Sequence, residues 1–361
     1  MVERRQIVER WSRGDASVLV TLVRTEGSSY RRVGARLLAG LDGYAGTISG
    51  GCLESEVTKR AVWMVRDGAV MERYSTMFDD TADVPYGLGC GGTLDLLLEP
   101  ARTTEFTALM RGLEASLAGV RATVLTWLPE GGRRLRRAVV SANGEIVFRS
   151  DGLGVDEIEA ALERDSPEVF AERIVPPQRL VVVGAGDDAR PVVSMASLLG
   201  WSVVVVDGRP QLARSERFPE AERVLVASAA ESTRLSLGTD DAVVLMTHSY
   251  EQDREWLAAV LPLAPRYFGV LGARHRSSLL VGEAAAMTGL TVAACCERIY
   301  APVGLDLGGD GPAAIALAVI AEAQACCMGR LPSSRRLSAE DVAEQMERGG
   351  ASRYLQAQCA L

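Results

Sequence analysis

After Pro176-Pro177, short runs of valine and other apolar residues alternate with helical segments, and this alternation limits the possible folds of the 361-residue chain. A parallel sheet covered by helices on both faces needs strands that are apolar at nearly every position, because neither face meets water. The strand-like runs are Leu180–Val183, Val203–Val206, Val224–Val226, Ala242–Met246 and Phe268–Leu271, with helices from about Asp188 and about Glu251. The second half is therefore expected to be an α/β domain built on a parallel sheet.

A glycine-rich turn after the first of these strands narrows the prediction. Gly184-Ala185-Gly186-Asp187-Asp188-Ala189 matches the G-x-G-x-x-[GA] dinucleotide pattern, and Asp207 ends the next strand 21 residues after Gly186, where a ribose-binding acid is expected. A Rossmann-like fold follows. Asp187 and Asp188 would repel a pyrophosphate at this turn. Two interpretations stay open: a bound nucleotide or NAD(P), and a Rossmann scaffold without one.

Other polar residues follow the predicted strands of this half, where open α/β sheets place their ligands. His248 is a candidate acid/base or ligand group, or else a histidine satisfied by hydrogen bonds. Arg209 and Arg274 suit a phosphate or an acidic partner, or are simply solvated. Asp306 lies in a glycine-rich loop before a helix that begins near Pro312, with Asp310 as its expected cap. It is either a ligand group or a turn former.

The first half contains two cysteines, each surrounded by glycines: Ser49-Gly50-Gly51-Cys52-Leu53-Glu54 and Gly87-Leu88-Gly89-Cys90-Gly91-Gly92. Glycine permits positive φ and close approach of a ligand to the backbone. The first turn opens a predicted helix over about Glu54–Arg66, whose amides and dipole would attract anions and lower the pKa of a thiol. Cys52 is therefore the stronger candidate for a ligating thiolate. The alternative is two tight turns with small buried cysteines.

A polar loop before the first turn, with Ser28, Ser29 and Arg31, adds positive charge together with Arg32 and Arg36. These parts suit a cofactor that carries phosphate and binds sulfur. The surrounding pattern predicts an α+β domain over residues 1–177: an opening helix, strands at Ser17–Thr25, Ala35–Ala39, Tyr44–Ile48, Ala69–Thr76 and Thr93–Glu99, and a helix with a β-meander within residues 103–150. The Rossmann-like domain would cover residues 178–330 and a helical tail residues 331–361.

Composition excludes several classes of protein. The net charge of −8 argues against a nucleic-acid partner. The N-terminus has no apolar signal-peptide core, and no run reaches the roughly 18 apolar residues of a membrane span. Seven cysteines, an odd number, do not suggest a disulfide framework, and two histidines leave few ligands for zinc. We expect a cytoplasmic protein with no membrane partner.

Taken in order, the motifs of both halves resemble the XdhC/CoxI family from about residue 10 to about residue 325. They are Gly27-Ser28-Ser29, Gly34-Ala35, the two glycine-cysteine turns, the Rossmann turn, Asp207, Thr247-His248, Tyr267–Gly272, Arg274 and Pro302–Asp306. The resemblance implies an N-terminal XdhC/CoxI-type domain. It also implies a maturation factor that binds the molybdenum–pterin cofactor, assists its sulfuration with a cysteine desulfurase, and delivers it to an apo molybdenum hydroxylase such as xanthine dehydrogenase or carbon monoxide dehydrogenase. Several members are dimeric, so a homodimer is expected.

The resemblance also implies which residues bind the cofactor. In the first half they are Ser28, Ser29, Arg31, Gly50, Gly51, Cys52, Gly89, Cys90 and Gly91, with Cys52 and Cys90 as candidate molybdenum ligands or sulfur-handling thiols. In the second half they are Gly184, Gly186, Asp207, Arg209, His248, Arg274 and Asp306. Departures from the family pattern cluster in the second half, at Asp187-Asp188-Ala189, Tyr250, Ala273, Ala314 and Ala318, with Tyr30 in the first. We therefore expect cofactor handling to depend on the first half.

Two other functions remain open. One is an NAD(P)-dependent oxidoreductase that uses the Rossmann-like domain, with His248 as acid/base. The other is a scaffold that links a desulfurase to the target enzyme without binding the cofactor.

Overall fold

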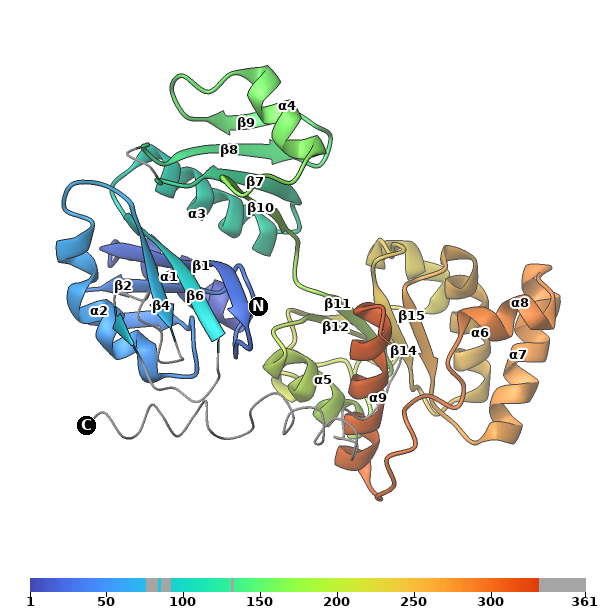
Figure 1. The fold of residues 1–361 in the computed structure, drawn as a ribbon. Helices are drawn as coiled ribbons and strands as arrows, with labels where there is room; N and C mark the ends of the chain where they lie inside the picture. Colours follow the sequence, from blue (N-terminus) through green and yellow to red (C-terminus); the bar gives the residue numbers. More distant parts are fainter. Residues whose placement is uncertain (76–83, 86–91, 131–132, 331–361) are drawn as a thin grey trace, which may run out of the picture. The chain divides into compact units, whose positions relative to one another are not determined.

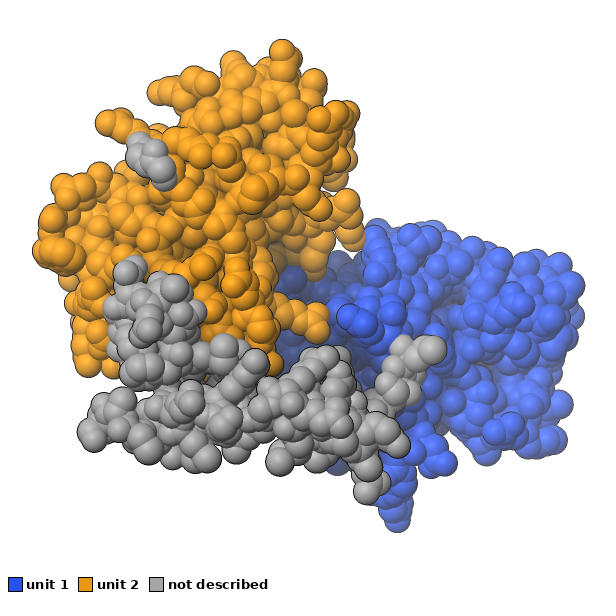
Figure 2. All heavy atoms as spheres, in the orientation of Figure 1, with its two compact units in different colours: residues 1, 177–335 blue, residues 2–176, 336–361 orange. Residues whose placement is uncertain are grey.

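A computed structural model of the chain describes residues 1–75, 84–85, 92–130 and 133–330. It divides into two compact units, one containing Val2–Pro176 and the other beginning at Pro177 (Figure 2). We call them the N-terminal unit and the C-terminal unit. The expected helical tail at residues 331–361, and Gly89, Cys90 and Gly91, lie outside the described residues.

The N-terminal unit contains two sheets (Figure 1). The six-stranded sheet has the order β3-β2-β1-β6-β4-β5 and is antiparallel except for the β4–β5 pair. Its strands are β1 (Val18–Gly27), β2 (Arg36–Gly40), β3 (Gly43–Gly46), β4 (Val70–Ser75), β5 (Val84–Pro85) and β6 (Gly92–Pro100). The four-stranded antiparallel sheet has the order β10-β7-β8-β9, with β7 (Ala122–Trp127), β8 (Arg136–Ser141), β9 (Ile146–Arg149) and β10 (Val169–Ile174). The predicted hairpin at Asp42-Gly43 and the β-meander are both present.

Helices cover these sheets. They are α1 (Val2–Ser12), α2 (Cys52–Met64), α3 (Thr104–Leu117) and α4 (Val155–Glu163). One face of the six-stranded sheet packs against α2 through Leu53, Val57 and Ala61. Its other face carries Leu19 and Leu38, which share a core cluster with residues of α1 and α3. The helix α2 starts at Cys52, two residues earlier than expected, because Glu54 caps it from inside its first turn.

The C-terminal unit has the predicted parallel sheet, in the order β13-β12-β11-β14-β15 (Figure 1). The strands are β11 (Arg179–Val183), β12 (Ser202–Asp207), β13 (Arg223–Val226), β14 (Ala242–Leu245) and β15 (Tyr267–Val270). The helices are α5 (Ala189–Leu198), α6 (Tyr250–Val260), α7 (Arg274–Thr288), α8 (Val292–Arg298) and α9 (Pro312–Cys327), with 3-10 segments at Ser215–Arg217, Ala229–Leu235 and Leu261–Leu263. Numbered along the chain within this unit, the strand order is 3-2-1-4-5, which is the Rossmann order 3-2-1-4-5-6 up to its fifth strand.

Alternate residues of each strand enter two cores. Val181, Val183 and Val243 pack with α6, α7 and α8. Leu180, Val182 and Val244 pack with α5 and α9. Both faces are therefore covered, which explains the continuous apolar runs and confirms the predicted fold class. The expected cap of α9 was wrong: Gly311 rather than Asp310 is its N-cap, because Pro312 occupies the first helical position.

Within the described residues, no single helix has the length and apolar content needed to cross a membrane. Only α7 and α8 taken together, across a bend of 113°, meet those criteria of length and composition.

Candidate functional site

A buried carboxylate holds the first glycine-cysteine turn together. Glu54 is 0% exposed. It accepts hydrogen bonds from the backbone N–H groups of Ile48 (3.0 Å), Ser49 (2.7 Å) and Gly51 (3.0 Å), and from the Ser49 hydroxyl (2.6 Å). Burial by itself would raise the pKa of Glu54, but these hydrogen bonds keep that pKa below its ordinary value. The turn is therefore rigid, with Gly51 at a φ of 114°.

This network already uses two of the backbone amides that were expected to attract an anion at the start of α2. Glu54 already accepts from Gly51 N–H, and the Ser49 hydroxyl oxygen accepts from Leu53 N–H at 3.3 Å. The backbone of Cys52 opens the helix, but its side chain lies outside the described part of the chain. The proposed thiolate ligands Cys52 and Cys90 thus stay predictions.

The loop after β1 lies beside two other segments that are far from it in the sequence, the first glycine-cysteine turn and Gly92. Gly27 of β1 pairs with Gly92 of β6, the residue that closes the second glycine-cysteine motif. A Cβ atom on Gly92 would lie 2.2 Å from the carbonyl oxygen of Ser28, so only glycine fits there. The ring of Tyr30 lies beside the first turn, because a Cβ atom on Gly50 would be 3.9 Å from its Cγ and Cδ1 atoms.

The arginines near this loop have different environments. Arg31 pairs with Glu3 of α1, which also accepts from the Thr47 hydroxyl at 2.9 Å. Arg36 is buried in β2 and pairs with Glu172, so its expected role in the positive surface was wrong. Burial lowers the pKa of Arg36 to about 9. Arg32 is exposed, and its side chain has no hydrogen-bond or ion-pair partner among the described residues. Among the described residues, Arg32 is thus the arginine of this loop that has no carboxylate partner.

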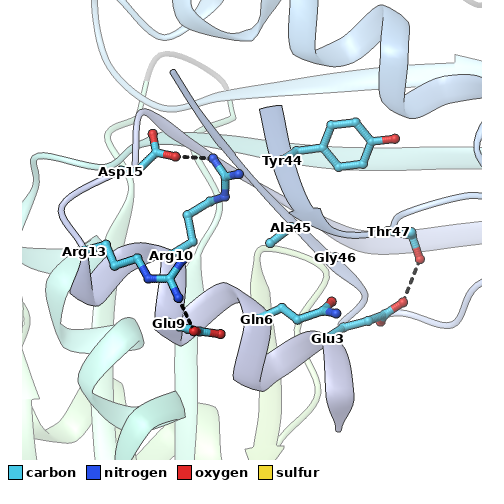
Figure 3. Close-up of a pocket in the computed structure, with 10 residues that line it drawn as sticks. All are labelled: Glu3, Gln6, Glu9, Arg10, Arg13, Asp15, Tyr44, Ala45, Gly46 and Thr47. Atoms are coloured by element: carbon cyan, nitrogen blue, oxygen red, sulfur yellow. Dashed lines mark hydrogen bonds and ion pairs between the residues drawn. The ribbon is translucent and has the colours of Figure 1, made fainter. Parts of the chain in front are cut away.

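A surface pocket of about 450 Å³ is lined by residues of α1 and β3, Glu3 among them (Figure 3). It is lined by Glu3, Gln6, Glu9, Arg10, Arg13, Asp15 and Tyr44–Thr47. Its arginines are paired, Arg10 with Asp15 and Arg13 with Glu9 (Figure 3). None of the predicted site residues lines it.

In the C-terminal unit, the glycine turn after β11 packs against the end of β14, and the two aspartates of the turn contact other side chains. A Cβ atom on Gly184 would lie 2.4 Å from the carbonyl oxygen of Met246, so the turn and the end of β14 touch. His248, whose φ is 63°, brings its Nε2 atom within 2.7 Å of Asp188 Oδ2. Asp187 pairs with Arg217 at 2.8 Å. The two carboxylates that follow Gly186 thus each contact a side chain of the same unit.

Asp207 has no acceptor position left for a ribose hydroxyl. Its Oδ1 accepts from the backbone N–H and Nε of Arg209, and its Oδ2 accepts from Ala185 N–H and Arg209 Nη2, all between 2.7 and 2.9 Å. A carboxylate offers about four acceptor sites. Burial alone would raise the pKa of Asp207, but these donors lower it on balance.

The sequence did not point to Asp253, which ties the neighbouring strand ends together. It is 0% exposed and accepts from the Thr247 hydroxyl at 2.6 Å and from Arg276 at 2.5 Å. One signal was available in the sequence: Asp253 follows the end of a predicted strand and lies four residues after Ser249, a good helix cap. Arg274 and Asp306 are exposed, and within the described chain neither joins this cluster. Among described residues, no group of three or more His, Cys, Asp or Glu side chains could hold a metal ion.

Comparison with known proteins gives matches in both units. The family model described as "XdhC and CoxI family" matches residues 10–75, and the one described as "XdhC Rossmann domain" matches residues 180–323. A Bacillus subtilis protein named as a probable subunit of xanthine dehydrogenase is 28% identical over 320 residues, covering 85% of this chain and 92% of the relative. The molybdenum cofactor insertion chaperone PaoD of Escherichia coli is 28% identical over 330 residues, covering 88% and 86%.

A solved structure extends this likeness to the fold. A crystal structure described as that of a xanthine dehydrogenase from Bacillus halodurans superposes with a TM-score of 0.78 at 30% identity, covering 94% of this chain and 98% of that one. With both family models matched in order, the chain belongs to the XdhC and CoxI family.

Proposed function

We propose that this protein is a molybdenum-cofactor binding and insertion chaperone for a molybdenum hydroxylase. The observation that carries the proposal is that the loop after β1 pairs with Gly92 of β6 through Gly27 and lies beside the first glycine-cysteine turn through Tyr30. The likeness to a cofactor insertion chaperone along 88% of the chain supports it. The cofactor is cargo in this proposal, bound for transfer rather than for turnover.

The residues at this end of the sheet suit such cargo. A molybdenum–pterin cofactor combines a flat heteroaromatic ring system, a phosphate and a metal centre with soft sulfur ligands. Glycines at positions 50 and 51 let the backbone approach a bulky ligand closely. Arg32, which has no partner in the described part of the chain, would supply a cation for the phosphate, and Cys52 and Cys90 would supply soft ligands to the metal.

The C-terminal unit gives little support to the rival function, an NAD(P)-dependent oxidoreductase. Asp207 has its acceptor positions filled, and Asp187 and Asp188 place negative charge beside the glycine turn. A pyrophosphate there would meet two carboxylates. His248 contacts Asp188 through Nε2, so a substrate could reach only its Nδ1 atom.

The partners follow from the same proposal. The first is an apo molybdenum hydroxylase of the xanthine dehydrogenase or carbon monoxide dehydrogenase type. A cysteine desulfurase that sulfurates the bound cofactor is the second, and a second copy of this chain is the third. We place all of these in the cytoplasm.

The test is binding of the molybdenum cofactor released anaerobically from a denatured molybdenum enzyme. We expect saturable binding to the full-length protein and activation of an apo molybdenum hydroxylase. The Cys52→Ala, Cys90→Ala double variant should lose at least tenfold in affinity. Cys296→Ala, an exposed cysteine of α8, is the matched control. If the wild type does not bind the cofactor, or if the double variant binds and activates like the control, the proposed role of the cysteines is wrong.

The scaffold alternative makes a different prediction for the same proteins. A scaffold would still capture the desulfurase and the target enzyme without both cysteines, and would bind no cofactor. Measuring partner capture beside cofactor binding therefore separates the two functions.

A further inference from the structure

Tyr30 is an aromatic residue exposed beside the first glycine-cysteine turn. Tyr30 is 74% exposed, whereas aromatic side chains usually bury a large part of their surface. The contact that the structure gives its ring is with the backbone at Gly50, where a Cβ atom would be 3.9 Å from Cγ and Cδ1. The ring therefore stands at the turn with most of its surface available to a ligand.

The loop that carries Tyr30 is held on both sides. The Ser29 hydroxyl donates to the carbonyl oxygen of Arg31 at 2.7 Å. Arg31 is fastened to α1 through Glu3, and Gly27 is fastened to β6 through its pairing with Gly92. A loop backbone held in this way loses little conformational entropy when a ligand binds, which favours recognition.

We propose that Tyr30 is the stacking platform for the pterin ring of the cargo. This inference rests on the proposed function and assigns a residue to one part of the ligand. A pterin is a flat, polar heteroaromatic ring system, and such rings gain affinity by stacking on aromatic side chains. Gly50 has no side chain beside the tyrosine ring, which leaves room for a second flat ring close to the turn.

The exposure of Tyr30 also makes the proposal easy to test. An exposed side chain contributes little to folding, so its removal should leave stability unchanged. Trp63 is a matched control, since it is 65% exposed and its ring is covered by Arg66 at 4.2 Å. It is on the same helix as Cys52 but 11 residues further along, about 16 Å from the helix start.

The experiment compares wild type, Tyr30→Ala, Tyr30→Phe and Trp63→Ala by titration with anaerobically released molybdenum cofactor. The readouts are the dissociation constant and the loss of pterin absorbance that accompanies stacking. We expect Tyr30→Ala to bind about tenfold more weakly without the absorbance change. Tyr30→Phe and Trp63→Ala should behave like wild type, and all four should melt alike.

Each outcome decides between the two claims. Equal affinity and equal absorbance change in wild type and Tyr30→Ala would overturn the role of Tyr30 and leave the chaperone function intact. A weakening that Tyr30→Phe does not rescue would also overturn it, because stacking needs the ring and not the hydroxyl. No binding by the wild type would overturn the proposed function itself, and the inference with it.

Discussion

The two units of this protein treat their glycine-rich turns in opposite ways. In the N-terminal unit, Glu54 and Ser49 hydrogen-bond the backbone of the turn, and Tyr30 remains exposed beside it, on the same loop as the exposed Arg32. In the C-terminal unit, the carboxylates around the glycine turn contact side chains of the same unit: Asp187 pairs with Arg217, Asp188 contacts His248, and Asp207 pairs with Arg209.

This difference teaches that a glycine turn is a backbone shape, and that a ligand site also needs free polar groups. The Rossmann turn has the expected backbone, with Gly184 at a φ of 117° against the end of β14. The carboxylates of Asp187 and Asp188 place negative charge beside it, which disfavours a pyrophosphate. The turn of the N-terminal unit has fewer features of a known motif, yet its surroundings offer an aromatic ring and a cation.

The largest effect should come from adding one methyl group in each unit, at Gly184 of the Rossmann turn and at Gly92 of β6. Gly184→Ala would put a Cβ atom 2.4 Å from the Met246 carbonyl oxygen, and Gly92→Ala would put one 2.2 Å from that of Ser28. Because backbone cannot move aside cheaply, each should cost about 3 kcal/mol or more. Hydrogen exchange read by mass spectrometry should show protection lost in the C-terminal unit for the first variant and in the N-terminal unit for the second.

The control for this comparison is Gly186→Ala. Its nearest neighbour would be the Asp188 carboxylate at 2.5 Å, a side chain that can turn away. We expect it to be much milder than Gly184→Ala. Equal losses from both variants would show that the contact with Met246 is not what makes the turn sensitive.

A smaller effect tests whether the negative charge of Asp187 and Asp188 is what prevents a nucleotide from binding at the Rossmann turn. The wild type should show no saturable binding of ADP, NAD or NADP by calorimetry. Asp187→Asn with Asp188→Asn removes two carboxylates near the turn and should raise the affinity for ADP about tenfold. Asp151→Asn with Asp156→Asn, both exposed in the N-terminal unit, changes the net charge equally and is the control. Tight dinucleotide binding by the wild type would break the comparison between the two units.

The smallest effect is a loss of folding stability at acid pH that depends on Asp207. Burial opposes the charge, but Arg209 and Ala185 N–H bring the folded-state pKa of Asp207 below its ordinary value. Its contribution to stability is therefore complete above the unfolded pKa of about 3.9 and is lost as pH falls through the lower folded pKa. Urea unfolding between pH 6 and pH 3 should show this loss in the wild type. The Asp207→Asn variant should be less stable at pH 6 and should lack this part of the acid-dependent decline.

Sequence reasoning was most successful where one residue pattern implies one arrangement. The apolar strands of the second half predicted the parallel sheet, because only burial on both faces explains such runs. The capping role of Glu54 and the burial of Arg36 were missed, since each depends on a partner that periodicity does not identify. Glu172, which neutralises Arg36, is 136 residues further along the chain.

By itself, the sequence determined the two kinds of fold, the positions of the glycine turns and the family to which they point. These features depend on local geometry: which residues tolerate positive φ, which runs are apolar, and where a helix can begin. Only the tertiary structure decided which charges remain free. Arg31 and Arg32 are adjacent and alike in sequence, but Glu3 neutralises Arg31, while Arg32 has no side-chain partner among the described residues. The physical reason is that electrostatic balance is set by neighbours in space, and folding brings those neighbours from distant parts of the chain.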